Sequence, residues 1–322
     1  MPIETSPRPL LPEPILVTEQ RWSQNEVPWV SVSCITYNHA PYIRDAMEGF
    51  LMQRTTFPVE ILIHDDASTD GTIEIIKEYE KQYPHLIFPM YQSVNRFSQG
   101  IKITPTYQIP RARGKYIALC EGDDYWTDPL KLQKQFDFLE KHPEYVLCFH
   151  KVRALEGSQV KEDEVMERRY LAIENKREIT VLDLLKHRNF IHTGSVMFRN
   201  IPIPAPFEIE FSPVGDYFLF ILLSEKGPLF RLDETMGIYR RGSGHYSTLS
   251  ALDMQRKVVQ YHIAILSYLS DDRHKRIFLQ KTLDALSDFE TLLKAHSEKR
   301  EMAGRAAKLK SLIKTLLVRK KT

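Results

Sequence analysis

VSVSCITYN, at residues 30–38, decides the fold: it is a β-branched, apolar run that ends in polar residues, which predicts a buried strand followed by a loop. Pro41 then stands at a favourable first helical position, ahead of a helix predicted over 42–53. The alternation continues, with strands predicted at 59–64, 86–91, 115–120 and 145–150 and helices at 70–83 and 129–141. This order predicts an α/β fold whose mostly parallel central sheet is flanked by helices and binds its ligand beyond the carboxyl ends of the strands.

Three parts are expected along the chain. Residues 1–28 contain six prolines and predict an extended leader, while 29–250 form the body and 251–322 a helical region. Within the body, the charged and weakly periodic stretch 151–178 predicts an excursion on the surface. Beyond it we expect helices at 181–186 and 216–224 and strands at 195–198, 229–232 and 238–240.

Composition excludes several classes of protein. The 322 residues are 43% hydrophobic and 27% charged, which is typical of a globular protein and excludes a disordered, collagenous or disulfide-scaffold chain. The longest apolar run, Tyr217–Leu223, is far shorter than the ~20 residues of a membrane-spanning helix. The first residues lack the pattern of a secretory signal, so we expect a cytoplasmic protein. Three cysteines without metal-like spacing predict buried thiols with no catalytic role: Cys34, Cys120 and Cys148.

The basic charge is concentrated at the C-terminus. Residues 302–322 carry seven lysines and arginines and no acid, so the net charge of +2 leaves −5 for the rest of the chain. This balance argues against a nucleic-acid partner for the body. Apolar residues at helical spacing form one stripe in the tail: Leu309, Leu312, Ile313, Leu316 and Leu317. Such a helix fits the cytoplasmic face of an anionic membrane, and the alternative is a helix packed on the body.

Acidic residues cluster where two predicted strands end. Asp65 and Asp66 follow the strand 59–64, and Glu121-Gly-Asp-Asp124 follows the strand 115–120. A doubly wound sheet brings such ends to one edge, where carboxylates are suited to Mg²⁺ or Mn²⁺ completed by substrate phosphates. The alternative is that these are solvated acids of ordinary turns.

At this point the sequence resembles the family-two glycosyltransferases with the GT-A fold. The resemblance runs in order over about residues 29–150. It is carried by VSVSCITYN at 30–38, EILIHDDASTDGT at 60–72, RGKYIALCEGDDYW at 113–126 and the DPLKLQ that follows at 128–133. It implies a glycosyltransferase that uses a nucleotide-sugar donor and a divalent ion, Mn²⁺ or Mg²⁺.

The resemblance also implies roles for the donor site. Thr36, Tyr37 and Asn38 match the segment beside the base, and Asp66 matches the acid that hydrogen-bonds the base. Asp123 would lie near the ribose and Asp124 would bind the metal. Glu121 stands where the family usually has an aspartate, and no arginine matches the usual nucleotide contact before residue 115, where Lys102 is the candidate substitute.

Asp216 is the candidate catalytic base. A sugar transfer needs a group that takes the proton of the acceptor hydroxyl. Asp216 opens an apolar helix and matches the family's catalytic aspartate, although Gly215 precedes it where a glutamate is usual. Its alternative role is a helix cap.

Further candidates line the sugar, acceptor or diphosphate site. His192, Thr193 and Ser195 precede a predicted strand and resemble the family's sugar and acceptor segment, and a plain turn is the alternative. The loop 239–245 offers Arg240 and Arg241 for a diphosphate and His245 for the metal, or is a surface loop with chance charges. Trp126, beside Tyr125, either floors the sugar site or packs the following helix.

These features together predict a metal-dependent, inverting glycosyltransferase. The donor would be a UDP-sugar and the acceptor a saccharide or lipid-linked saccharide of bacterial surface polysaccharide. We expect it in the cytoplasm, with the tail placing it peripherally on the membrane. A nucleotidyltransferase would show a glycine-rich phosphate loop after the first strand, which residues 36–41 do not provide. A non-catalytic nucleotide- or saccharide-binding module is the other alternative.

Overall fold

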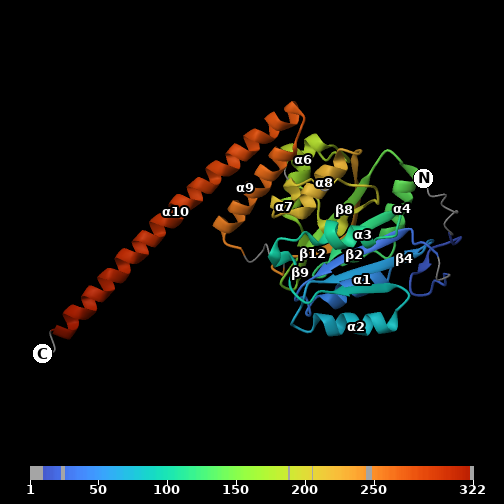
Figure 1. The fold of residues 1–322 in the computed structure, drawn as a ribbon, viewed down its shortest axis with the longest axis horizontal. Coiled ribbons are helices and arrows are strands. Elements are labelled where there is room, and N and C mark those ends of the chain that lie inside the picture. Colours follow the sequence, from blue (N-terminus) through green and yellow to red (C-terminus); the bar gives the residue numbers. More distant parts are fainter. Residues whose placement is uncertain (1–9, 23–25, 188, 205, 244–248, 320–322) are drawn as a thin grey trace.

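The computed structural model describes residues 10–22, 26–187, 189–204, 206–243 and 249–319, and the side chains of these residues up to Ser297. A mixed sheet forms its centre, in the order β10-β12-β8-β11-β6-β2-β4-β5, with β7 and β9 attached at the side. Helices cover both faces of this sheet, and α10 extends away from the body (Figure 1). The predicted α/β fold with a central sheet flanked by helices is therefore confirmed.

The first half of the sheet is parallel. β2 (Val30–Thr36) lies between β4 (Val59–Asp65) and β6 (Tyr116–Glu121), with Val30 opposite both Val59 and Tyr116, and β5 (Ile87–Tyr91) follows β4. The connecting helices are α1 (Ile43–Leu51), α2 (Thr72–Gln82), the short α3 (Ile109–Arg111) and, after β6, α4 (Lys131–Lys141). Each predicted strand and helix of this half is present within a few residues, and the carboxyl ends of the strands share one edge.

The second half contains antiparallel strands. β11 (Met197–Arg199) lies antiparallel between β6 and β8 (Leu147–Glu156), and β12 (Leu229–Arg240) runs parallel to β8. The strands predicted at 229–232 and 238–240 are thus one strand, which crosses irregular register between Arg231 and Gly237. At the margins, β10 (Glu178–Ile179) and β7 (Tyr125–Trp126) pair with β12, and β1 (Ile15–Leu16) pairs with β3 (Arg54–Thr55).

The stretch 151–178 lies mostly on the surface, as predicted, but it forms ordered strands and a helix that the sequence did not predict. β8 continues to Glu156, turns into β9 (Gln159–Glu162) and is followed by α5 (Glu164–Ala172). Tyr170 and Ile173 are buried in the core, and Met166 packs against it. These apolar residues lie one helical turn apart, so a charged stretch still has one face that packs against the body.

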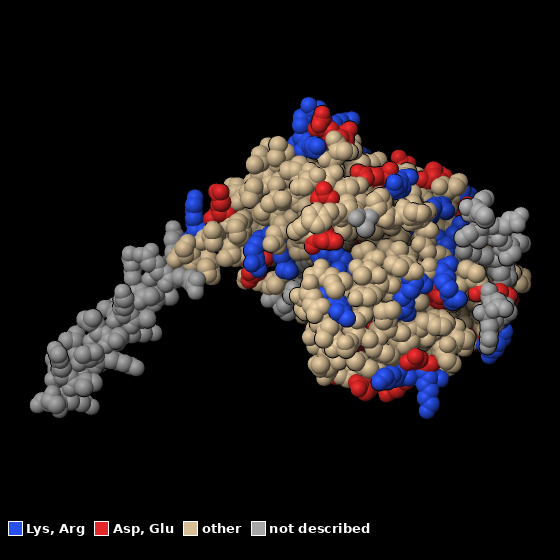
Figure 2. Space-filling model, viewed as in Figure 1, with Lys and Arg blue, Asp and Glu red and all other residues tan. Residues whose placement is uncertain are grey.

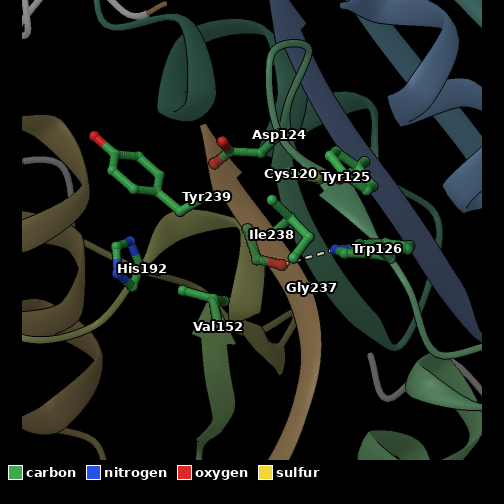
Figure 3. Close-up of a pocket in the computed structure, with 10 residues that line it drawn as sticks. Cys120, Asp124, Tyr125, Trp126, Val152, His192, Gly237, Ile238 and Tyr239 are labelled. Atoms are coloured by element: carbon green, nitrogen blue, oxygen red, sulfur yellow. Dashed lines mark hydrogen bonds between the residues drawn. The ribbon is translucent and has the colours of Figure 1, made fainter. Parts of the chain in front are cut away.

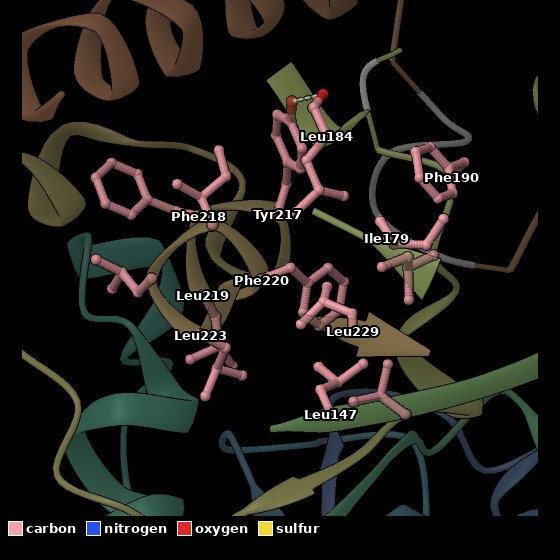
Figure 4. Packing of buried hydrophobic residues seen from close by; sticks show 14 of the residues in the cluster. Leu147, Ile179, Leu184, Phe190, Tyr217, Phe218, Leu219, Phe220, Leu223 and Leu229 are labelled. Atoms are coloured by element: carbon pink, nitrogen blue, oxygen red, sulfur yellow. Dashed lines mark hydrogen bonds between the residues drawn. The ribbon is translucent and has the colours of Figure 1, made fainter. Parts of the chain in front are cut away.

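The core around α8 (Gly215–Ser224) explains its apolar sequence. Tyr217 to Leu223 are all buried, and the Tyr217 hydroxyl donates to the Leu184 carbonyl of α6 (Val181–His187) at 2.7 Å (Figure 4). α7 (Glu208–Phe211) precedes it, and α9 (Ala251–Tyr268) places Tyr261 and Ile265 in the same cluster. This packing holds the first turn of α8 rigidly beside the sheet.

The helical region is broken once. α9 ends at Tyr268 and α10 runs over Asp272–Arg319, because the Asp271 carboxylate accepts the backbone N–H of His274 and starts a new helix. Among the described residues no helix is both long and apolar enough to cross a bilayer. The three cysteines are free and buried, as predicted.

Candidate active site

The close approach of β2 and β6 creates the acidic edge. Gly122 follows β6, and a Cβ at this position would come within 2.7 Å of Thr36 Oγ1 at the end of β2. The glycine therefore lets the turn that carries Asp123 and Asp124 lie directly against the β2 terminus. Thr36 is buried, and none of the described groups bonds its hydroxyl.

Asp123 and Asp124 are held by the end of β12. The Arg240 backbone N–H donates to Asp124 Oδ1 at 2.8 Å, and Arg240 Nε donates to the Asp123 carbonyl at 2.9 Å. Ser243 donates its hydroxyl to Asp123 Oδ2 at 2.8 Å, and His39 Nε2 lies 4.0 Å from the same oxygen. Residues more than a hundred positions apart thereby fix the orientation of both carboxylates.

Asp216 lies in the first turn of α8 and not at its cap. Val214 occupies the cap position, and Asp216 Oδ1 accepts the N–H of Tyr217 at 2.7 Å. Its other oxygen accepts from the Thr193 hydroxyl at 3.0 Å and from Asn189 Nδ2 at 3.4 Å. The position thus differs from the N-cap alternative, and the side chain is directed toward the 193–195 turn.

Neighbouring negative charges raise the pKa of two acids of the edge, Glu121 and Asp124. Burial, followed by the charges of Asp123 and Asp216, raises the pKa of Glu121 to about 8, although this side chain remains open to solvent. Burial and the charges of Asp123 and Glu121 raise the pKa of Asp124, and burial also raises that of Asp216. Carboxylates from β6 and α8 therefore share one electrostatic environment that a cation would stabilise.

The oxygen ligands at this edge fit a divalent ion whose coordination is completed by oxygens of the substrate. Within the described ranges no three His, Cys, Asp or Glu side chains are grouped as a ready-made metal cage. One or two carboxylates with phosphate oxygens are the usual arrangement for Mg²⁺, and Mn²⁺ also favours oxygen ligands. Asp124 and Asp123 suit this arrangement, whereas His245 lies outside the described residues.

A small cavity adjoins Asp124. Its volume is about 10 Å³, close to the space needed for one water molecule, and its lining includes Asp124, His192 and Tyr239. These three side chains surround one space in Figure 3. The cavity joins a residue of the β6 terminus to residues that precede β11 and end β12.

A second ion-pair network holds His192. His192 Nε2 lies 3.2 Å from Asp163 Oδ2, and its ring lies 4.6 Å from the Tyr239 ring. Arg241 donates to Asp163 at 2.6 Å and to Glu156 at 2.7 Å. Burial alone would raise the pKa of Asp163. The bonds from His192 and the charge of Arg241 outweigh this effect and lower the pKa of Asp163 to about 2. Arg241 is thus engaged with acids of the protein itself.

Arg240 is also engaged within the protein. Its guanidinium donates to Asp45 at 2.7 Å and lies over the rings of Tyr42 at 4.7 Å and Tyr125 at 5.5 Å. Neither arginine of the 239–245 loop therefore has an unpaired guanidinium directed at the acidic edge.

The predicted base-binding segment surrounds a strained loop. The Tyr37 side chain is exposed, whereas Asn38 has a left-handed φ of 54° and accepts the Thr69 N–H at 2.8 Å. Asp66 accepts the backbone N–H groups of Arg96 and Phe97 at 2.8 and 2.9 Å. Positive φ at a non-glycine residue is characteristic of functional loops.

Lys102 lies near α9 at a half-buried position. Burial and the charge of Lys257 lower the pKa of Lys102, so two cations face the same region. Lys102 is distant in sequence from the turn that carries Asp123 and Asp124, and none of the described contacts joins the two.

Two predicted sugar-site residues are buried in structural roles. Trp126 is 2% exposed, packs edge-on against Phe50 at 4.9 Å and donates Nε1–H to the Gly194 carbonyl at 2.7 Å. Ser195 is fully buried and donates its hydroxyl to the His192 carbonyl at 2.6 Å. The packing alternative therefore describes Trp126 better than a sugar floor does.

Comparisons with known proteins identify the family. Residues 31–201 match the family model described as Glycosyl transferase family 2. The chain belongs to this family. The chain is 43% identical over 212 residues to the uncharacterized protein Rv1520 of Mycobacterium tuberculosis, and the match covers 66% of this chain and 58% of that protein. It is 36% identical over 115 residues to the putative teichuronic acid biosynthesis glycosyltransferase TuaG of Bacillus subtilis, covering 36% of this chain and 43% of TuaG.

Solved structures confirm the GT-A type of fold. TarS of S. aureus, residues 1–349, matches with a TM-score of 0.58 at 20% identity, over 81% of this chain and 73% of that one. The mannosyltransferase PcManGT of Pyrobaculum calidifontis matches with a TM-score of 0.58 at 15% identity, over 87% and 79%. The chain spans 58% of the length of its mycobacterial relative.

Sequence reasoning missed several residues of the site. The predicted site residue His192 is contacted by Asp163 and by Tyr239. The predicted base Asp216 is contacted by Asn189. The DEVM pattern at 163–166 indicates a helix start, but no local pattern indicates that this cap also bonds His192.

Proposed function

We propose that this glycosyltransferase moves a sugar from a UDP-sugar to a hydroxyl of a saccharide or lipid-linked saccharide, with metal dependence and inversion. The observation that carries the proposal is the gathering of acids at one edge of the sheet, from the end of β6, the turn after it and the first turn of α8. There the charges of Asp123 and Asp216 raise the pKa of Glu121, and the charges of Asp123 and Glu121 raise that of Asp124. The cation of a donor diphosphate would bind where these negative charges repel one another. The catalytic base would lie beside the bound diphosphate.

The nucleotide would bind along the end of β2. Exposed Tyr37 offers a ring for the base, while Thr36 is buried beneath the Asp123 turn and would support it. TarS was solved in complex with UDP-GlcNAc, and PcManGT in complex with GDP-Man and Mn²⁺. These relatives of fold support a nucleotide-sugar at this edge, and the choice of UDP rests on the resemblance of the motifs.

Asp124 would hold the divalent ion, Mn²⁺ or Mg²⁺, and Asp123 would lie near the ribose. When bound, such an ion supplies Lewis-acid stabilisation of the charge that develops on the leaving diphosphate. The hydrogen bond from the Arg240 backbone fixes Asp124 Oδ1, so Oδ2 is the oxygen left for a ligand.

Asp216 would act as the base. The acceptor oxygen forms a bond to the anomeric carbon while the bond from that carbon to the diphosphate oxygen breaks, and the acceptor proton passes to Asp216. Attack opposite the leaving group inverts the anomeric configuration. A raised pKa suits this role because it makes the carboxylate a stronger base, and Thr193 and Asn189 orient it.

A thermal-shift screen of nucleotide diphosphates, with and without Mn²⁺, tests the donor part of the proposal. We expect UDP to stabilise the fold only in the presence of the ion, and UDP-sugar hydrolysis to follow in the wild type. Stabilisation without any turnover would instead support a non-catalytic binding module. Absence of stabilisation by any nucleotide would contradict the proposal.

The C-terminal helix is proposed to bind the cytoplasmic face of an anionic membrane. The backbone of α10 is helical to Arg319 and extends from the body (Figure 1), which supports the proposal. Basic and acidic side chains are intermixed over the body in Figure 2. We propose that 29–250 form the catalytic body and that 251–322 form its attachment region, with bacterial surface polysaccharide as the setting.

Deletion of residues 303–322 tests the attachment. The truncated protein should leave the membrane fraction and retain donor hydrolysis, and it should lose binding to anionic vesicles. Unchanged fractionation would contradict this part of the proposal.

A further inference from the structure

Lys131 is a buried amine without a carboxylate partner. It is the first residue of α4, its side chain is fully buried, and none of the described residues offers an acceptor to Nζ. Burial lowers the pKa of Lys131 to about 7. An amine in this position costs stability, so its presence requires an explanation other than fold stability.

The face of the Trp126 ring lies against this amine. Nζ lies 3.7 Å from the centre of the indole ring, well within the range of a cation–π contact. Lys131 therefore covers one face of the Trp126 ring, and Phe50 packs edge-on against the same ring with the ring centres 4.9 Å apart. The ring has little freedom to move.

Trp126 in turn fixes the turn that lies between the two proposed functional acids. Its Nε1–H donates to the Gly194 carbonyl at 2.7 Å, drawn as the dashed line in Figure 3. A Cβ at Gly194 would lie 3.6 Å from Asp124 Oδ2, and neighbouring Thr193 donates to Asp216. A shift of this turn would therefore change the positions of both acids relative to each other.

A second residue of α4 supports the same turn. Gln135 lies one helical turn after Lys131, is fully buried and donates Nε2–H to the Ser195 carbonyl at 2.9 Å and the Cys148 carbonyl at 3.2 Å. Helix α4 thus supports the 193–195 turn directly through Gln135 and indirectly through Lys131 and the Trp126 ring.

We propose that Lys131 is a positioning residue for sugar transfer: through the Trp126 ring it fixes the 193–195 turn and with it the distance between Asp124 and Asp216. The proposal rests on the proposed function, since it assigns to Lys131 the alignment of the two acids of that reaction.

The test compares Lys131→Met with Lys134→Met. Methionine fills the space of the lysine stem without the amine, and Lys134 is a more exposed residue of the same helix that pairs with Asp128. We expect Lys131→Met to lower kcat for UDP-sugar turnover by about 10- to 100-fold, because small misplacements of reacting groups have effects of this size. The KM for the donor should change less than about twofold, and the melting temperature should stay equal or rise because a costly buried amine is removed.

The indole N–H resonance of Trp126 gives a readout that does not depend on activity. It should shift in Lys131→Met and remain in place in Lys134→Met. Trp126→Phe, which removes the N–H donor, should lower kcat similarly, and the double variant should lose no more than the stronger single variant.

Three results would overturn the inference. They are a kcat of Lys131→Met within twofold of Lys134→Met, a loss of kcat that accompanies a lower melting temperature, or additive effects in the double variant. If the wild type turns over no donor, the proposed function fails, and the indole resonance still decides whether Lys131 fixes Trp126.

Discussion

Asp124, which follows β6, and His192, which precedes β11, line the same small cavity. They differ in the part of the sheet that carries them and in the contacts that orient them. Asp124 follows a strand of the parallel half of the sheet, where every strand places its carboxyl end at the same edge. His192 lies in the half that contains antiparallel strands, and its orientation depends on Asp163, which begins α5.

The difference concerns how the chain brings each acid to the site. In the first half, strand and turn chemistry brings Asp123 and Asp124 to the edge, with Gly122 allowing the turn to lie against Thr36, and contacts from the distant end of β12 then orient the two side chains. In the second half, Asp216 is oriented by Thr193 and Asn189, which lie more than twenty positions away. We therefore expect substitutions in the first half to affect donor binding, and substitutions in the second half to affect catalysis with the donor still bound.

Asp124→Asn should have the largest effect. Loss of the metal-binding carboxylate should lower turnover by about 10⁴-fold, since charge stabilisation by the ion is worth several kcal/mol and each 1.4 kcal/mol is tenfold. UDP-sugar hydrolysis with Mn²⁺ measures it. Asp137→Asn, on α4, is the control with unchanged activity. Retention of a tenth of wild-type turnover would exclude Asp124 as a metal ligand.

Asp216→Asn should lower turnover by about 10³-fold, because the acceptor hydroxyl loses its base. Transfer to an acceptor measures this loss, and Glu210→Gln on the exposed side of α7 is the control. The raised pKa of Asp216 places the acid limb of the pH profile above the ordinary carboxyl range, so activity should fall as the pH drops through that raised value. An acid limb at the ordinary aspartate pKa would argue against Asp216 as the base.

Asp163→Asn should have a smaller effect, about tenfold on kcat, because His192 loses the charged partner that orients it. Glu156→Gln is a matched control: Glu156 shares Arg241 with Asp163 but does not bond His192. Steady-state kinetics of the two variants make the comparison. Equal losses in both would mean that the ion-pair network acts on stability alone.

The smallest expected effect concerns pH and metal removal. Glu121 has a folded-state pKa of about 8, above its ordinary 4.5, so the folded state keeps a proton that the unfolded chain has lost. The free energy of unfolding should therefore fall as the pH rises from about 4.5 to about 8. Because solvent screens this exposed group, we expect a change of only a few degrees in the melting temperature.

Thermal melts with EDTA and with Mn²⁺ check this prediction. Stabilisation by Mn²⁺ should be larger at pH 8 than at pH 6, since the ion favours the deprotonated carboxylates, and Glu121→Gln should flatten the pH dependence. A melting temperature that rises with pH in EDTA would contradict it.

Sequence reasoning predicted the first half of the molecule well because its information is local. The alternation of strand and helix from Val30 to Lys141 was confirmed, including the buried β2. It placed 151–178 on the surface but missed the helix there, because charged residues conceal the helical spacing of Met166, Tyr170 and Ile173, and it divided β12 at its irregular register. The Asp163 contact with His192 spans 29 positions, and no local pattern encodes it.

The candidate roles of the acids remain predictions with a common test. The most direct test of which acid binds the ion and which acts as the base is calorimetric titration of UDP. It is carried out in Mn²⁺ and in EDTA on the wild type, Asp124→Asn and Asp216→Asn. Wild type and Asp216→Asn should bind UDP equally within about twofold and only with the ion, and Asp124→Asn should lose the ion-dependent part. Equal loss of UDP binding in both variants, or full binding by Asp124→Asn, would contradict it.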